Sequence, residues 1–376
     1  MTINMYNKFF PYPLFRFLLI ITCLVPLNSF KATTPIVLKD APIAFKPSGY
    51  YIAEVIDERA TANAIAQLVI KAPGNKTANQ QTDLQGGALT AINKFIARNL
   101  AKDTSLKAVS ISIKELKIIE TPLTGNRADG QIKLSLSYGL QKEYGIEPLV
   151  NYQGGFHYIR LNDNMADVEL HLRKTIINGL TFFNKWFIAN APHNVKLANK
   201  VKFTFTDYTE PVEGDTIYYS PRRPLTWADF QSKLAPRGPY AASVMPSIAY
   251  EQQSKIADGT IYVTLAMKAY VAKSSCWVKP GIHDNYSLNH EQRHFDVVKI
   301  IAEQFKQKIL AQKLTPDTYE GFITMQYLDS YRDMYAMQQA YDKETGNGRH
   351  PDIQARWNER IDKELKASGL IVSNQM

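Results

Sequence analysis

The chain has very little cysteine, and its two cysteines, Cys23 and Cys276, lie in different contexts. Cys23 falls in an apolar run near the N-terminus that we predict below to be removed, which leaves Cys276 alone. One remaining thiol excludes an internal disulfide framework, so side-chain packing must hold the mature protein together.

Three other features that would identify a class of protein are also missing. No segment repeats with a period of roughly 20 to 50 residues, which excludes a solenoid or a propeller. The net charge of +9 is spread along the chain rather than clustered, so we predict no nucleic-acid binding. Beyond residue 32 no apolar run is long enough to cross a membrane, so no stable membrane span is expected after processing.

The N-terminus has the pattern of a secretory signal peptide. Lys8 and Arg16 precede the short apolar run Phe17–Val25, and small or polar residues follow it. Lipidation of Cys23 is a weaker alternative, because Thr22 stands where a small Gly, Ala or Ser would be expected. We therefore predict that residues 1–32 are removed and that the protein is exported to the periplasm, the cell surface or the medium.

The mature chain has two parts, and the first spans residues 40–210. Apolar residues at helical spacing predict helices at 88–100 and 166–187, and strand-like runs occur at 50–56, 109–113 and 132–136. Because strands and helices come in blocks, we predict an α+β sandwich of unknown role. His157 and His171 stand alone, and lone histidines are ordinarily packed or surface residues.

The second part spans residues 215–376 and follows a polar, Pro- and Gly-bearing linker at 209–215. Two β-type runs, 247–253 and 260–271, flank Asp258-Gly259, which favours a hairpin turn. Three helices are predicted after the hairpin. They cover 288–310, a segment from an N-cap at Thr315-Pro316 to about 343, and 352–367.

The first of these helices contains the string His290-Glu291-Gln292-Arg293-His294. Histidines at i and i+4 lie one turn apart on one side of a helix, so both imidazoles can reach one zinc ion. The glutamate between them would lie beside the open coordination position, where it can take a proton from a water. Apolar residues continue the histidine stripe, so the histidines should point inward: Val298, Ile301, Phe305 and Ile309.

Several motifs follow one another through residues 215–370. They are Leu225-Thr226-Trp227-Ala228-Asp229-Phe230, Ser275-Cys276-Trp277-Val278, the His290–His294 string with Phe295-Asp296, Tyr341-Asp342-Lys343-Glu344-Thr345, and then Gln354 and Trp357. This set resembles domain of unknown function 922, a bacterial family described as zinc-dependent proteases. The resemblance implies a zincin-like fold in which the hairpin flanks the cleft above the helix that carries the histidines.

The sequence departs from the family pattern after Glu344-Thr345, where a His-Gly or His-Ser pair is replaced by Asn347-Gly348. A catalytic zinc site needs a third protein ligand. A short connection between helices favours antiparallel packing, which would return residues 342–350 to the level of His290. We predict His350 as the third ligand, with Glu344 and then Asp342 as alternatives.

Other side chains near the motif are predicted to pack or to support the site rather than to bind the metal. Asp296 lies two residues beyond His294 and so points away from the metal, and we expect it either to support a ligand from behind or to pack against a neighbouring basic residue. Tyr327, Tyr331 and Tyr335 are spaced by four, which favours an aromatic packing stripe over a phenol that stabilises an oxyanion. Three tryptophans and Cys276 are expected to be buried packing residues: Trp227, Trp277 and Trp357.

Two functions from different classes remain open on the sequence. The first is an exported zinc peptidase that cleaves a peptide or protein substrate, with Glu291 as general base. The second is a non-catalytic envelope protein that keeps the zincin scaffold for binding. Glu291 favours the first, because a structural site needs no base, and Asn347 together with the large N-terminal part favours the second.

Overall fold

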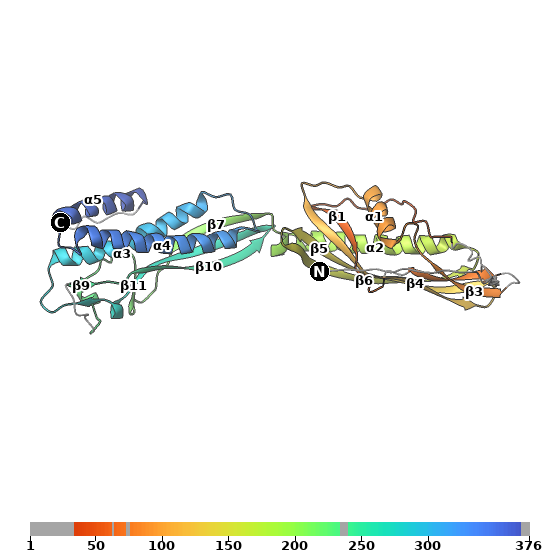
Figure 1. The fold of residues 1–376 in the computed structure, drawn as a ribbon, viewed down its shortest axis with the longest axis horizontal. Coiled ribbons are helices and arrows are strands. Elements are labelled where there is room, and N and C mark those ends of the chain that lie inside the picture. The colour runs from red at the N-terminus through yellow and green to blue at the C-terminus, as the bar shows by residue number, and fades with distance from the viewer. Residues whose placement is uncertain (1–33, 62–63, 73–75, 234–239, 370–376) are drawn as a thin grey trace, which may run out of the picture. The chain divides into compact units, whose positions relative to one another are not determined.

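The structure is a computed structural model that describes residues 34–61, 64–72, 76–233 and 240–369. The predicted signal peptide lies outside these ranges. The chain divides into two compact units, the first ending at Thr181 and the second beginning at Phe182 (Figure 1). Both units combine sheets with helices, so the α+β prediction is confirmed. No helix in the described part of the chain is both long and apolar enough to cross a membrane.

The first unit is built around one sheet with the strand order β3-β2-β4-β5-β6, to which β1 adds a parallel pairing with β4. Its elements are β1 (Tyr50–Asp57), β2 (Ala66–Ala72), β3 (Lys76–Thr82), α1 (Ala88–Asn99), β4 (Lys107–Leu123), β5 (Arg127–Lys142), β6 (Gly145–Leu161) and α2 (Met165–Asn190). The helix α2 continues past the end of the unit. Both predicted helices and the three predicted strands are present.

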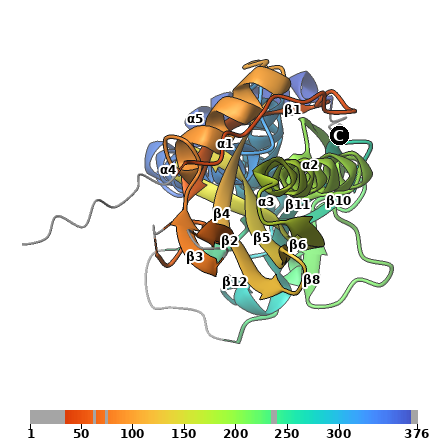
Figure 2. The same cartoon turned by 90° about the vertical axis from the view of Figure 1, so that its right-hand side faces the viewer.

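The two helices cover one face of this sheet. Figure 2 shows α1 and α2 on the same side of the strands, and Gly179 of α2 lies against Leu136 and Tyr152. Along β5 burial alternates with a period of two, and Ile132, Leu134 and Leu136 face the helices. The first unit is therefore a two-layer α+β sandwich.

The two lone histidines of this unit are a packed residue and a surface residue, as predicted. The ring of His171 stacks on Phe156 at 4.4 Å between centroids and on Tyr158 at 5.0 Å. Exposed His157 lies beside Asp129, with 2.6 Å between Nε2 and the carboxylate. Neither belongs to a group of metal-ligating side chains among the described residues.

The second unit contains a mixed sheet with three helices. Its elements are β7 (Lys200–Asp207), β8 (Thr216–Tyr218), β9 (Ala242–Ser243), β10 (Ser247–Ala257), β11 (Thr260–Ala272), β12 (Trp277–Val278), α3 (Asn285–Leu310), α4 (Tyr319–Thr345) and α5 (Pro351–Ala367). The main sheet has the order β10-β11-β7, with β8 antiparallel to β11, and β9 pairs with β12.

The boundary between the units differs from the sequence-based one. Strand β7 lies before the polar segment 209–215, yet it pairs in parallel with β11 of the second unit over Lys200–Asp207. The polar segment is therefore a loop between β7 and β8 inside the second unit. A parallel pairing across about 60 residues leaves no local signal in the sequence, because only the side-chain pattern of each strand is local.

The hairpin is confirmed. Strands β10 and β11 pair from Ser247↔Tyr270 to Ala257↔Thr260, which leaves Asp258 and Gly259 as a two-residue turn. Both turn residues have positive φ, 49° and 67°, as a primed turn requires. Alternate residues of β11 are buried and join one core with the inner face of α3.

The N-caps of α3 and α4 show where these helices begin, and α4 begins later than predicted. Asp284 caps α3 by accepting the backbone N–H of Ser287 at 2.8 Å. The next helix does not begin at Thr315-Pro316, because Thr318 is the N-cap of α4. The hydroxyl of Thr318 accepts the backbone N–H of Thr315 at 3.1 Å, so residues 315–318 form a turn before the helix.

Candidate metal centre

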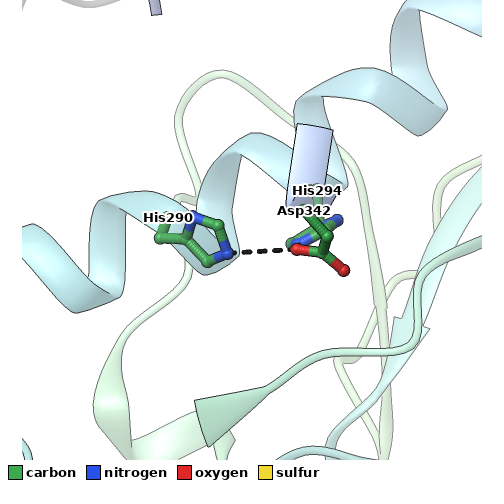
Figure 3. Close-up of side chains that lie close together, drawn as sticks. All are labelled: His290, His294 and Asp342. Carbon is green, nitrogen blue, oxygen red and sulfur yellow. Dashed lines mark hydrogen bonds and ion pairs between the residues drawn. The ribbon is translucent and has the colours of Figure 1, made fainter. Parts of the chain in front are cut away.

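Three metal-ligating side chains meet between α3 and α4. His290 and His294 project from α3 toward Asp342 of α4 (Figure 3). Asp342 Oδ1 lies 3.3 Å from His290 Nε2 and 3.0 Å from His294 Nε2. One potential ligand atom from each of the three residues lies within 4.8 Å of the others. Two imidazole nitrogens and a carboxylate oxygen can therefore bind one ion.

The local sequence explains why these residues meet. The predicted inward stripe of α3 is confirmed, since His290 and His294 are only 6% and 7% exposed and the apolar positions below them are buried. The helix α4 packs against α3 and carries Asp342 in its last turn, and Gly346 with φ of 60° ends it. The short inter-helix connection thus brings the end of α4 to the histidines, as predicted.

The other two candidates for the third ligand lie outside this group. His350, the preferred one, is exposed at the N-cap of α5, and its ring lies against Gly346. Glu344 accepts a hydrogen bond from Trp357 Nε1 at 2.8 Å. Because α4 remains helical through Thr345, Asp342 faces α3, and the turn at 346–348 carries His350 past the site.

Two glutamine side chains orient the imidazoles. Gln354 Oε1 lies 3.0 Å from His290 Nδ1, and Gln338 Oε1 lies 3.0 Å from His294 Nδ1. An amide oxygen only accepts, so each Nδ1 carries the hydrogen and each Nε2 faces the ligand group. The amide nitrogen of Gln354 donates to Asn289 at 3.4 Å, which fixes which end of the amide faces His290.

Sequence reasoning missed Gln338 as part of the site. A signal for it was available, because Gln338 precedes Asp342 by one helical turn and so shares its face of α4. Gln354 was noticed only as part of the family motif. Its contact depends on α5 packing beside α3, which no local pattern predicts.

Tyr341 packs against both histidines, and Trp357 packs against Tyr341. The Tyr341 ring is fully buried, stacks on His290 at 4.7 Å between centroids and meets His294 edge-on at 5.0 Å. Its other side contacts Trp357 at 5.4 Å. Trp357 and Trp277 are both 5% exposed and Cys276 is 1% exposed, so their predicted burial is confirmed, whereas Trp227 is only partly buried against the core. Burial also raises the pKa of the Cys276 thiol to about 11.

Glu291 lies beside the ligand group without joining it. It is 6% exposed, and its Oε2 accepts the backbone N–H of Val244 at 2.9 Å. Burial raises the pKa of Glu291, although the two histidines and the Val244 N–H act in the opposite direction. A buried carboxyl whose pKa is raised can hold and release a proton nearer to neutral pH.

Contacts between Asp342 and the two histidines determine the charge state of Asp342. Burial acts to raise the pKa of Asp342, but hydrogen bonds from His290 and His294 outweigh it and hold that pKa far below its usual range. For His294, burial acts to lower the pKa, and the hydrogen bond to Asp342 outweighs it. Asp342 is therefore ionised, which is the state that binds a metal.

Asp296 contacts a basic residue, which is the second of its two predicted roles. It forms an ion pair with Arg293 at 2.9 Å and accepts hydrogen bonds from Tyr219 at 3.1 Å and Gln292 at 2.8 Å. Arg293 also pairs with Asp362 of α5 at 2.7 Å. This network ties α3 to α5 on the side away from the ligand group.

A cavity of about 540 Å³ opens over the ligand group. It is lined by residues 240–245 on one side and by α4 and the following turn on the other, through Gln338, Asp342 and Asn347. Trp277 and Tyr286 also line it, and Arg349 is the one Lys or Arg side chain among its described lining residues. Gly348 presses against His290, where an added Cβ would lie 3.4 Å from Nδ1.

The predicted tyrosine stripe of α4 is only partly a packing stripe. Tyr327 packs edge-on against Tyr250 at 5.2 Å, and its hydroxyl donates to the Ile248 carbonyl at 3.0 Å. Tyr331 and Tyr335 are 48% and 62% exposed. A spacing of four drifts by about 40° per step around a helix, so the row passes from the core to the surface.

Comparison with known proteins yields no family. No family model matches the chain, and no curated protein sequence matches it. Among solved structures, a protein of Xanthomonas campestris from domain of unknown function 330 is 7% identical, covering 42% of this chain and 99% of that chain with a TM-score of 0.29. A minor lipoprotein of Acinetobacter baumannii is 14% identical, covering 24% and 72% with a TM-score of 0.19. Neither similarity is high enough to identify a shared fold.

Proposed function

We propose that this chain is an exported zinc-dependent peptidase whose second unit has a zincin-like fold. The observation that carries the proposal is the meeting of His290, His294 and Asp342 with Glu291 beside them in one cavity. Three protein ligands plus an acid–base carboxylate outside the ligand set are what hydrolytic zinc sites require.

The donor set fits zinc rather than calcium or magnesium, because imidazole nitrogens suit a borderline-soft ion and the harder ions prefer oxygen. Gln338 and Gln354 leave both Nε2 atoms available as ligands. When bound, zinc acts as a Lewis acid on a carbonyl and lowers the pKa of a coordinated water.

The chain's own residues would then handle the proton and the substrate. Glu291 takes a proton from the attacking water and later delivers it to the leaving amine. The Val244 N–H holds one oxygen of that carboxylate, and Glu291 lines the cavity. The substrate backbone would lie along residues 242–245, opposite Gln338 of α4.

The replacement of the family's histidine by Asn347 does not weaken this proposal. Asp342 completes the group from α4, while Asn347 lines the cavity at a positive φ of 56°. The non-catalytic alternative drew on Asn347 and on the large N-terminal part, and the placement of Asp342 beside both histidines supports the catalytic proposal against the first of these points. The resemblance to domain of unknown function 922, and export after loss of residues 1–32, remain parts of the proposal.

The direct experiment is metal analysis and proteolysis with the mature protein. We expect about one zinc per chain and hydrolysis of a mixed unfolded protein substrate. Removing zinc with a chelator should abolish hydrolysis, and adding zinc back should restore it. Zinc-loaded protein with no hydrolytic activity on peptides of varied sequence would contradict the peptidase function. N-terminal sequencing of the native protein tests export, since a retained Met1 would contradict processing.

A further inference from the structure

The face of α4 that carries Gln338 and Asp342 continues away from the metal centre as a row of exposed apolar side chains. Leu328, Tyr331 and Tyr335 are 51%, 48% and 62% exposed. With Gln338 and Asp342 they follow an alternating spacing of three and four, which keeps side chains on one side of a helix. The row therefore leads along the surface to the cavity, which Gln338 and Asp342 line.

Nothing in the described part of this chain covers the row. No hydrogen bond holds the hydroxyls of Tyr331 and Tyr335 among the described residues, whereas Tyr327, which faces the core, is bonded. The nearby charges are paired, Asp329 with Arg332 and Asp333 with Lys308. A single exposed apolar side chain is ordinary, but a continuous row that ends in a cleft indicates an interaction surface without charge preference.

We infer that the face formed by Leu328, Tyr331 and Tyr335 binds an apolar stretch of an extended polypeptide substrate. The inference rests on the proposed peptidase function and specifies its substrate class. The occupant follows from continuity, because Gln338 and Asp342 line the cavity and stand on the same helix face as the row. Leu328 stands 14 positions before Asp342, about 21 Å along the helix. An extended chain covers that distance with about six residues, so the substrate is a polypeptide and not a di- or tripeptide.

The test is peptide binding to the zinc-loaded mature chain with Glu291→Gln, so that no cleavage interferes. The probes are fluorescein-labelled peptides of 20 residues with a Leu/Val block before the centre, a Leu/Val block after the centre, or only Gly and Ser. The triple variant Leu328→Ser, Tyr331→Ser, Tyr335→Ser should bind whichever block peptide the parent prefers at least tenfold more weakly. The control is Val212→Ser, because Val212 is 80% exposed but lies in the loop between β7 and β8 and not on α4.

Each outcome separates this inference from the peptidase function. Equal binding of all three peptides, or no effect of the triple variant, overturns the docking face even if the active protein hydrolyses peptides. If the binding variant prefers a block peptide but the parent protein, which retains Glu291, hydrolyses no peptide, the peptidase function is contradicted and the docking face is supported. If sedimentation detects dimers of the parent but not of the triple variant, the face binds a second copy of the chain, and the inference is overturned. Zinc content and circular dichroism check that the triple variant folds. If the triple variant does not fold, the single variant Tyr335→Ser replaces it in the binding experiment.

Discussion

Gln338 and Asp342 hold the two nitrogens of one imidazole from the same face of α4. Gln338 Oε1 lies 3.0 Å from His294 Nδ1, and Asp342 Oδ1 lies 3.0 Å from His294 Nε2. The two residues are one helical turn apart, so a single rigid helix sets both the orientation of the ring and the position of the facing ligand.

The third ligand is the first point to test. Asp342→Ala should lower zinc affinity far more than His350→Ala or Glu344→Ala, because only Asp342 lies with the two histidines. Competition with a chromogenic zinc chelator measures the three affinities in otherwise identical proteins. A loss of affinity in His350→Ala as large as in Asp342→Ala would show that the turn at 346–350 rearranges to supply the ligand.

The orienting glutamines should matter for affinity without being ligands. Gln338→Leu and Gln354→Leu keep the side-chain volume but leave the Nδ1–H groups without acceptors, so zinc affinity should fall by about 10- to 100-fold. Gln339→Leu is the matched control, since Gln339 is an exposed neighbour on the same helix. Parent-like affinity in both variants would mean that packing by Tyr341 alone orients the rings.

The stability of the second unit should depend on pH through Asp229. Burial acts to raise the pKa of Asp229, but hydrogen bonds from Arg223 and Thr226 outweigh it and lower that pKa. A lowered folded-state pKa contributes stability above the unfolded value of about 3.9 and loses it as the pH falls through the folded value. Asp229→Asn should therefore cost about 1–3 kcal/mol at pH 7 and progressively less below about pH 4.

Urea unfolding followed by tryptophan fluorescence measures this effect, because all four tryptophans lie in the second unit. Asp333→Asn is the control, since Asp333 is 50% exposed in its pair with Lys308 and should cost under about 1 kcal/mol. A difference between parent and Asp229→Asn that stays constant from pH 7 to pH 3 would contradict the role of the charged carboxylate.

Local sequence patterns predicted much of the fold and half of the site. Helical spacing placed His290, Glu291 and His294 on the inner face of α3, and turn chemistry placed the hairpin at Asp258-Gly259. These features depend on residues within one or two turns of each other. The antiparallel return of α4 was also predictable from the short connection, and it brought the correct segment to the histidines.

The remaining errors concern long-range contacts and turn geometry. His350 was preferred because it offers an imidazole, whereas the structure brings Asp342 to the two histidines, because the point where α4 ends decides which side chain faces α3. Strand β7 was assigned to the first part because its partner β11 is distant in sequence. The role of Gln354 depends on α5 packing against α3, a tertiary contact that no local pattern contains.

The central claim is that Glu291 is the proton carrier of a hydrolytic zinc site and not one of its ligands. The most direct measurement is zinc content and peptide hydrolysis of Glu291→Gln beside the parent protein. The amide keeps the shape and can still accept the Val244 N–H, but it cannot take a proton. We expect zinc to remain bound and hydrolysis to fall by about 10²- to 10⁴-fold. Unchanged turnover with zinc bound, or loss of zinc from the variant, would contradict the account.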